Sequence, residues 1–240
     1  MSSPSAIGEV VAATTTYFTA QCTQVADADS TLTSDLPDPP SFGSFVRIGP
    51  ELHATPPVPG EDFDPFESAP PLFAPPVPGE AIALYAVVFQ AETGSLEPGR
   101  LVTAYGLDEA ELRRSQPQIF ELLATRFSAA LIAYAGLDGV VRPFLPPRPP
   151  RPHAQVCAAT TDETRRLTVR LDYLRPLLAG GSAGAASYPP DELVAALLRN
   201  ACHAAHPNEA AFLLRAGREL ATLLPMNYDR LRALIGRITG

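Results

Sequence analysis

Proline is spread so unevenly along this 240-residue chain that it limits where helices and sheets can form. Thirteen of the 27 prolines fall between residues 37 and 78, and six more fall between residues 143 and 152. Proline fixes φ and has no backbone N–H, so it disfavours helix interiors and central strands. We therefore expect these two segments to be extended or irregular, and the rest of the chain to be free to fold.

A Pro/acid-rich insert at residues 50–79 overlaps the first of these segments, and the hexapeptide PPVPGE occurs at residues 56–61 and 75–80. Polyproline II or an irregular conformation is expected there. Acidic and aromatic residues are interleaved between residues 61 and 67, a composition that can dock on basic partners. Phe63, Phe66 and Phe73 are therefore candidate protein-binding residues, with a loop that has no partner as the alternative.

All 18 basic residues are arginine. The lack of lysine argues against P-loop NTPases, Schiff-base enzymes and protein kinases, which need a lysine for their chemistry. The charge is also divided: residues 1–99 contain one base and 13 acids, and residues 100–240 contain 17 bases and 13 acids. This division predicts an acidic face and a basic face with different partners, although a solvated surface gives the same pattern.

Cysteine usage and the absence of apolar runs indicate the compartment. Cys22, Cys157 and Cys202 are odd in number and far apart, which does not resemble a disulfide framework. The first residues lack the pattern of a signal peptide, and no apolar run approaches the ~18–20 residues of a membrane span. The expectation is a cytoplasmic protein without a membrane partner.

Residues 1–106 show the pattern of short strands with glycine at the bends. Strands are expected over residues 7–13, 14–23, 42–49, 81–93 and 101–106. The fourth of these is expected to have a core face that holds Ile82, Leu84, Val87 and Phe89, although periodicity alone does not fix which of them share it. Several short strands without helical periodicity predict a small N-terminal β-barrel.

Residues 107–240 are predicted to form a mixed, mostly helical domain, which makes the fold class α+β. A Pro/Arg-rich connector at residues 143–152 divides this second domain. Helices are expected from residue 108, over 117–127, 161–178, from 189, over 208–224 and over 227–238, with strands at 128–134 and 153–158.

Two enzyme-like motifs occur, and we expect neither to act. Residues 94–100 have the glycine spacing of a phosphate-binding loop, but arginine replaces its lysine, and a turn between strands is expected instead. Residues 180–184 match G-x-S-x-G around Ser182, yet a nucleophile elbow joins a strand to a helix, and this motif follows a predicted helix. No catalytic residue and no cofactor is predicted.

A metal site is the other enzymatic alternative. Cys202, His203 and His206 lie close together on one predicted helix, and His153 and Cys157 are the available partners. Zinc needs three or four ligands, and neither C-x-x-C nor H-E-x-x-H is present. Histidines also suit the C-terminal end of a helix for electrostatic reasons. No metal site is predicted, and a hydrolase or metal enzyme ranks last among the hypotheses.

Arginine is densest around the second proline segment. The candidate nucleic-acid-binding residues are Arg142, Arg148, Arg151, Arg165, Arg166 and Arg170. Arginine suits phosphate by its fork geometry, but no helix-turn-helix, zinc-finger or RNP signature accompanies these residues. Residues 146–152, PPRPPRP, are also similar to an SH3 ligand, and a rigid wall with solvated or paired arginines is a further alternative.

Three segments in order resemble a known family. They are IGEVVAATTTYFTAQC at residues 7–22, FGSFVRIG at residues 42–49 and LYAVVFQAETGSLEPGR at residues 84–100. Together they resemble the HAS barrel, the β-barrel shared by HerA-type DNA translocases and the rotary ATP synthase subunits. Ala86 stands where the family pattern has glycine, and the insert at 50–79 is longer than the pattern requires.

The resemblance implies a stand-alone HAS-barrel protein, because the chain lacks the ATPase domain of HerA. Such a protein is expected to be a non-catalytic partner of a HerA-like hexameric ATPase and its NurA-like nuclease in DNA end processing. The barrel carries no family catalytic residue, so none is transferred. Direct DNA binding through the arginine-rich half is the first alternative.

Overall fold

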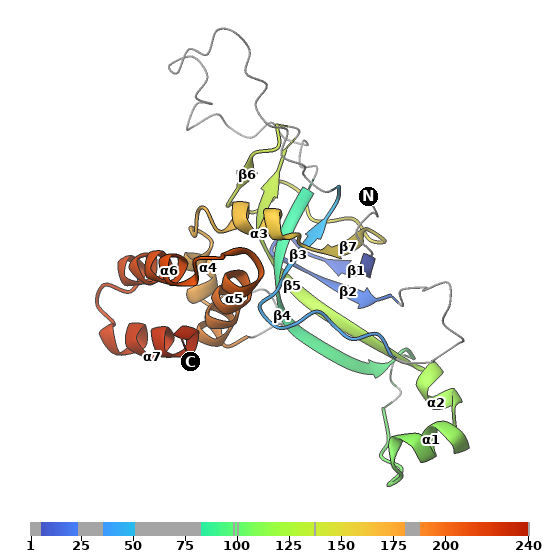
Figure 1. Ribbon diagram of the computed structural model, residues 1–240. Helices are drawn as coiled ribbons and strands as arrows, with labels where there is room; N and C mark the ends of the chain where they lie inside the picture. Colours follow the sequence, from blue (N-terminus) through green and yellow to red (C-terminus); the bar gives the residue numbers. More distant parts are fainter. Residues whose placement is uncertain are drawn as a thin grey trace.

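The computed structural model describes residues 6–23, 36–50, 83–97, 99, 101–136, 138–180 and 188–239. Within them the fold is α+β, with seven strands and seven helices (Figure 1). The strands are β1 (Ala6–Ala13), β2 (Tyr17–Cys22), β3 (Phe45–Ile48), β4 (Ala83–Ser95), β5 (Leu123–Ala135), β6 (Val141–Arg142) and β7 (Gln155–Ala158). The helices are α1 (Glu109–Ser115), α2 (Gln118–Glu121), α3 (Thr161–Leu167), α4 (Leu174–Leu178), α5 (Pro190–Ala205), α6 (Glu209–Leu223) and α7 (Tyr228–Thr239).

The strands form one antiparallel sheet in the order β2-β1-β7-β3-β4-β5-β6. β2 pairs with β5 as well, with Tyr17 opposite Ala130 and Gln21 opposite Arg126. The pairings therefore link β1, β2, β5, β4, β3 and β7 in a ring. Because β5 and β7 follow residue 106, the sheet contains strands from both sides of the predicted domain boundary.

Each face of this sheet has its own hydrophobic core. In β4, Leu84 packs in a cluster formed by strand residues alone, which we call the inner cluster. Val87 and Phe89 pack on the other face, in an outer cluster that includes side chains of the helices. The inner cluster comprises Val10, Phe18, Ala20, Cys22, Val46, Ile48, Leu84, Ala86, Val88, Phe127, Ala129, Leu131, Tyr134 and Val156. The prediction of a single core face in this strand is thus wrong, because both faces are buried; Ile82 lies outside the described residues.

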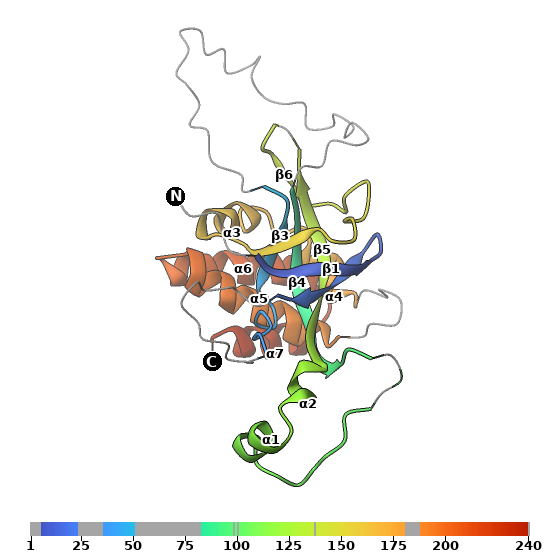
Figure 2. The ribbon, with the colours of Figure 1, turned by 90° about the vertical axis from the view of Figure 1, so that its right-hand side faces the viewer.

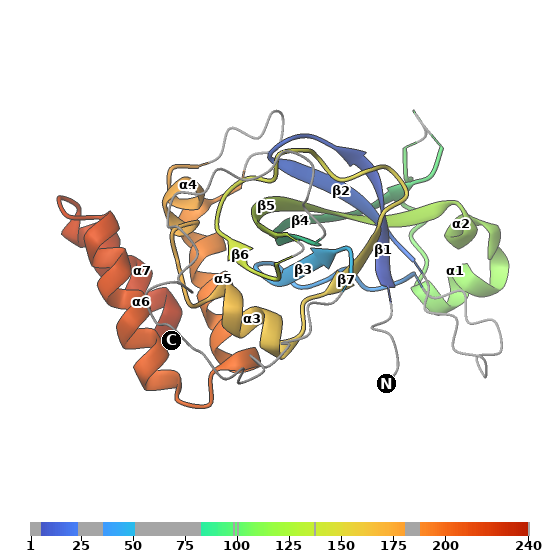
Figure 3. The same cartoon turned by 90° about the horizontal axis from the view of Figure 1, so that it is seen from above.

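Helices α3 to α7 form a layer on the outer face of the sheet (Figures 1 and 3). α5 is the central helix of this layer, with nine buried residues. Gly43 brings the sheet close to it: a Cβ at Gly43 would lie 2.7 Å from the backbone nitrogen of Leu197, and the φ of Gly43 is +79°. Glycine is therefore required at this turn for both its conformation and its lack of a side chain.

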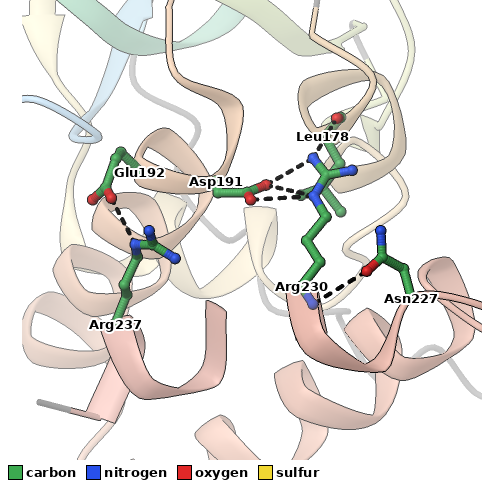
Figure 4. A network of polar contacts seen from close by, with 6 residues as sticks. All are labelled: Leu178, Asp191, Glu192, Asn227, Arg230 and Arg237. Carbon is green, nitrogen blue, oxygen red and sulfur yellow. Dashed lines mark hydrogen bonds and ion pairs between the residues drawn. The ribbon is translucent and has the colours of Figure 1, made fainter. Parts of the chain in front are cut away.

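A polar network fixes α7 to the start of α5 (Figure 4). The guanidinium of Arg230 donates to both oxygens of Asp191, at 2.7 Å from Nη2 to Oδ1 and 3.2 Å from Nε to Oδ2. It also donates to the backbone carbonyl of Leu178 at the end of α4. Arg237 donates to Glu192 at 2.6 Å. Two arginines of α7 thus bind the acidic first turn of α5, where negative charge suits the helix dipole.

Most of the predicted elements are confirmed. These are the strands at 7–13, 14–23, 42–49, 81–93, 128–134 and 153–158, and the helices from 108, from 189, over 208–224 and over 227–238, each with shifted bounds. Residues 101–106 have no regular structure, so the predicted strand there is wrong. Residues 117–127 form α2 and then the start of β5. The predicted helix over 161–178 is divided into α3 and α4, and Pro176 lies in the first turn of α4, where proline is tolerated.

In the part of the chain that the structure describes, no helix is both long enough and apolar enough to cross a bilayer.

Candidate functional site

The connection between β4 and β5 projects from the rest of the fold (Figure 1). We call the described residues between 96 and 122 the arm. Beyond Gln90, β4 pairs with β5 alone among the described strands, so the two form a ribbon that leaves the sheet. The arm, with α1 and α2, lies at the end of this ribbon, away from helices α3 to α7 (Figures 2 and 3).

The arm exposes apolar side chains in a short stretch. Leu101 is 87% exposed, Val102 60% and Tyr105 46%. Neither α1 nor α2 has a buried residue. Large apolar side chains gathered on one exposed surface mark an interaction site more often than isolated ones do.

Three cavities lie beside α2. Leu101, Val102 and Tyr105 form a cavity of about 110 Å³ together with Ile119 and Leu122. Phe120 of α2 lines a cavity of about 230 Å³ and a more open one of about 640 Å³. The arm therefore offers depressions with both apolar and polar walls beside its exposed apolar side chains.

Local polar contacts give the arm its shape. Asp108 caps α1 by accepting the backbone N–H of Glu111 at 2.7 Å. Arg113 forms an ion pair with Glu109 at 2.8 Å and lies 4.3 Å above the ring of Phe120, which joins α1 to α2. A cation over an aromatic face adds ~0.5–1 kcal/mol at an exposed site. The surface is thus shaped without a core of its own.

One of the cavities contains a cysteine. Cys22, at the end of β2, lines the 230 Å³ cavity beside Phe120. Burial raises the pKa of the Cys22 thiol to about 11. A thiol with such a pKa stays protonated near neutral pH and is a poor nucleophile.

A second polar centre lies on the helix-covered face of the sheet. Arg47 and Glu163 are 2% and 1% exposed, and the Arg47 Nε atom lies 3.0 Å from Oε1 of Glu163. Tyr85 donates its hydroxyl to the same Oε1 at 3.1 Å, and Thr160 donates its backbone N–H to Oε2 at 2.9 Å. Burial and the Glu163 charge raise the pKa of Tyr85, so its hydroxyl remains a donor. This centre joins β3 and β4 to α3.

The six predicted nucleic-acid-binding arginines do not share one role. Three of them form ion pairs with neighbouring acids: Arg142 with Asp138, Arg165 with Asp162, and Arg170 with Asp172. Arg148 and Arg151 are exposed on the connector, and Arg166 is half-buried. Within the described ranges these last three have no ion-pair partner. Hydrogen bonding from Arg142 holds the pKa of Asp138 below its usual value.

The candidate metal ligands are engaged elsewhere. The Nε2 atom of His206 lies 2.8 Å from the hydroxyl of Thr168, and its ring stacks on Phe212 with centroids 4.0 Å apart. Cys202 is buried, which raises the pKa of its thiol. His203 is exposed, with its Nδ1 atom 3.3 Å from Glu209. Among the described residues, no three His, Cys, Asp or Glu side chains are grouped as a metal site would require.

His153 and Cys157, the other two candidate metal ligands, belong to strand β7 and to the turn that precedes it. His153 is at the turn before β7 and contacts Glu9 of β1. Cys157 lies in β7 opposite Arg47 of β3. Neither position is on the helix that contains Cys202.

Most of the remaining candidate residues lie in parts of the chain that the structure does not describe. Phe63, Phe66 and Phe73 lie outside the described residues, as does Ser182. In the loop-like motif at 94–100, Gly94 and Ser95 end β4, where they lie opposite Ala124 and Leu123 of β5. These two residues therefore belong to the ribbon.

No protein-family model matches the chain, and no curated protein matches it. The site is therefore defined by its own geometry.

Sequence reasoning missed the arm and the buried pair. The helix-start signals at Asp108 and Pro117 indicated an inserted segment, but residues 101–106 were assigned to a strand. For the buried pair, the Thr160-x-x-Glu163 spacing of a capping box was the available signal. Its second role, as the counter-charge of Arg47, depends on a contact 116 positions away in the sequence.

Proposed function

We propose that the protein is a non-catalytic interaction module that docks on a partner protein through its arm. The exposed apolar side chains of Leu101, Val102 and Tyr105, and the small cavity that they line, carry this proposal, since the surface lies on a projecting element and lacks a covering segment among the described residues. We assign the partner as a HerA-like hexameric ATPase, acting with a NurA-like nuclease in DNA end processing.

The sheet supports the finer part of this proposal. The ring of paired strands and its inner cluster are compatible with a small barrel of the HAS type. The segments that resemble this family include β1, β2, β3 and β4, four of the six strands of the ring. The partner assignment rests on this resemblance, and the docking surface rests on the arm.

A binding experiment separates the two parts. The full chain is immobilised, and purified HerA-like ATPase and NurA-like nuclease from the same genome are titrated by biolayer interferometry. The double substitution Leu101→Asp with Tyr105→Asp places charge at the docking surface, and we expect it to weaken binding at least tenfold, on the order of one lost hot spot. Both positions are exposed, so the fold is expected to remain intact.

A matched control substitutes two exposed apolar residues that lie away from the arm. Met226 is 96% exposed and Tyr228 73% at the turn between α6 and α7. Met226→Asp with Tyr228→Asp should bind as the unaltered chain does. Equal binding by the arm variant and the unaltered chain would overturn the docking surface. Absence of binding to either purified protein would overturn the partner assignment.

Direct DNA binding is a second candidate, favoured by one observation. Arg148 and Arg151 are exposed on the connector and have no acid partner in the described chain. Binding through them requires an affinity for duplex DNA that falls steeply with salt and is lost in Arg148→Glu with Arg151→Glu. An affinity insensitive to salt, or unchanged in this variant, would exclude it.

A further inference from the structure

A cavity with a charged rim lies at the opposite end of the sheet from the arm. It is lined by the turn and strand around Gly139 and Val141, and by the α3–α4 connection around Arg166, Val169 and Arg170. β6 is paired with the last residues of β5, and the arm begins at the other end of that strand, on the order of 40 Å away along β5. This site is thus independent of the proposed function.

The cavity is the size of one large side chain. Its volume is about 210 Å³. Sites for drug-sized ligands and cofactors run to roughly 300–1,000 Å³, so this one is small for such a molecule. Its walls are apolar, formed by Ala133, Val141, Pro143 and Leu167. An apolar side chain presented by a peptide fits both the volume and the walls.

The rim is positively charged. Arg166 forms no hydrogen bond or ion pair with the residues that the structure describes, although it is half-buried. Arg170 is paired with Asp172, with its Nε atom 2.9 Å from Oδ2. Of the two rim arginines, Arg166 is therefore the one left without an acid. A guanidinium at the edge of an apolar cavity binds a carboxylate through charge-assisted hydrogen bonds.

The unpaired guanidinium rules out some occupants. A purely apolar segment that covers Arg166 leaves a cation without a counter-charge in a partly dehydrated interface, which is costly. A basic segment is repelled. An acidic segment compensates the charge of Arg166 while its apolar side chain enters the cavity.

We propose that this cavity binds an acidic peptide segment of a partner protein, with an aromatic side chain in the cavity and an adjacent carboxylate on Arg166. Val169, which is 67% exposed, contacts the outer edge of the ring. The complementary charges set the orientation of the segment, and the apolar walls supply most of its affinity.

The probe for a direct test is a fluorescein-labelled peptide, GEDFDPFES, which repeats residues 60–68 of this chain and combines four acids with two aromatic rings. Fluorescence anisotropy is measured on titration with the full chain. We expect saturable binding that weakens about tenfold or more in Arg166→Gln, as for the loss of one hydrogen bond to a charged group. Val169→Asp should weaken it similarly.

Two controls make the result specific. Arg232→Gln removes the same charge from an exposed position on α7 and should leave the Kd within about twofold. The peptide GEDSDPSES keeps the acids but lacks the rings, and it should not bind. Equal binding of both peptides, or an effect of Arg232→Gln as large as that of Arg166→Gln, would reduce the interaction to general charge attraction and overturn the proposal.

The chain's own residues 61–67 have the same composition as the probe, so a second titration uses the full chain with Phe63→Ser and Phe66→Ser. Binding of the peptide by this variant alone would assign the cavity to the chain's own segment and overturn the partner assignment. Absence of binding by both chains would overturn the site itself.

Discussion

Replacing Glu163 with glutamine removes one buried charge and hardly changes the size of the side chain. The carboxylate of Glu163 contacts Arg47, Tyr85 and the backbone N–H of Thr160. Tyr85 and Thr160 donate to different carboxylate oxygens, so the single amide oxygen of glutamine can keep one of these hydrogen bonds but not both. The guanidinium of Arg47, however, is 2% exposed and loses its counter-charge.

The magnitude follows from how little else compensates that guanidinium. The Nε atom of Arg47 lies within ion-pair distance of Glu163 without the alignment of a hydrogen bond, Nη2 has no hydrogen-bond acceptor among the described residues, and Nη1 donates to the carbonyl of Gly49. Removing one member of a buried ion pair costs about 3–5 kcal/mol. That is a large share of a total stability of ~5–15 kcal/mol. We therefore expect Glu163→Gln to lower the melting temperature by roughly 6–20 °C.

Urea denaturation followed by circular dichroism at neutral pH measures this loss. The decisive comparison is the double variant Arg47→Met with Glu163→Gln. Because it removes both charges, it should be more stable than Glu163→Gln alone, with a coupling free energy of about 2 kcal/mol or more. A loss below about 1 kcal/mol in Glu163→Gln, or simple additivity in the double variant, would refute the buried pair as the link between β3 and α3.

Three further substitutions test other parts of the structure by thermal and urea denaturation. Gly43→Ala should cost about 2–4 kcal/mol, because its Cβ meets the backbone of α5 and its φ is positive, whereas Gly217→Ala on α6 meets no atom within 4 Å and should stabilise by up to about 1 kcal/mol. Equal effects would contradict the close approach. Tyr173→Phe should be neutral or stabilising by up to about 1 kcal/mol, since the buried hydroxyl has no partner among the described residues; a clear loss would reveal one. Burial and two nearby arginines lower the pKa of His206 below its usual 6.5, so the unfolded chain binds the proton more readily. Stability should therefore fall from about pH 7.5 to about pH 5.5, and this fall should be shallower in His206→Gln; identical pH profiles would exclude the effect.

The elements that were predicted correctly carry their signals locally. β2 shows strict alternation, with Phe18, Ala20 and Cys22 buried, and it appears where the alternation predicts it. α5 and α6 begin at Pro190 and after Asn208, both of which are start signals that need no tertiary contact. For such segments, the local sequence and the final fold agree.

The errors occur where tertiary contacts override local preference. Leu123–Phe127 continues a helical pattern in the sequence, but in the structure it is hydrogen-bonded along β4, with Phe127 also opposite Ala20 of β2. The face assigned to β4 was mixed because a strand buried on both sides has no polar residues to mark its faces. The single helix predicted over 161–178 is two helices, and Pro176 is consistent with this division because proline is tolerated in the first turn of a helix but not in its interior.

The candidate sites depended even more on long-range contacts. The arginine cluster was predicted from its density in the sequence, yet Arg142, Arg165 and Arg170 each have an acid within four positions, a spacing that allows the ion pairs found. The cavity beside Arg166 combines residues from 133 to 173, and local periodicity contains no information on such a contact.

Hydrogen–deuterium exchange of the full chain, with and without the HerA-like ATPase, tests the central claim most directly. The backbone N–H groups of residues 101–107 and of α2 should exchange more slowly when the partner is added. Those of α6 and α7 should be unaffected. Protection confined to α6 and α7, or exchange in the arm that is unchanged at saturating partner, would contradict the account of the arm as the docking surface.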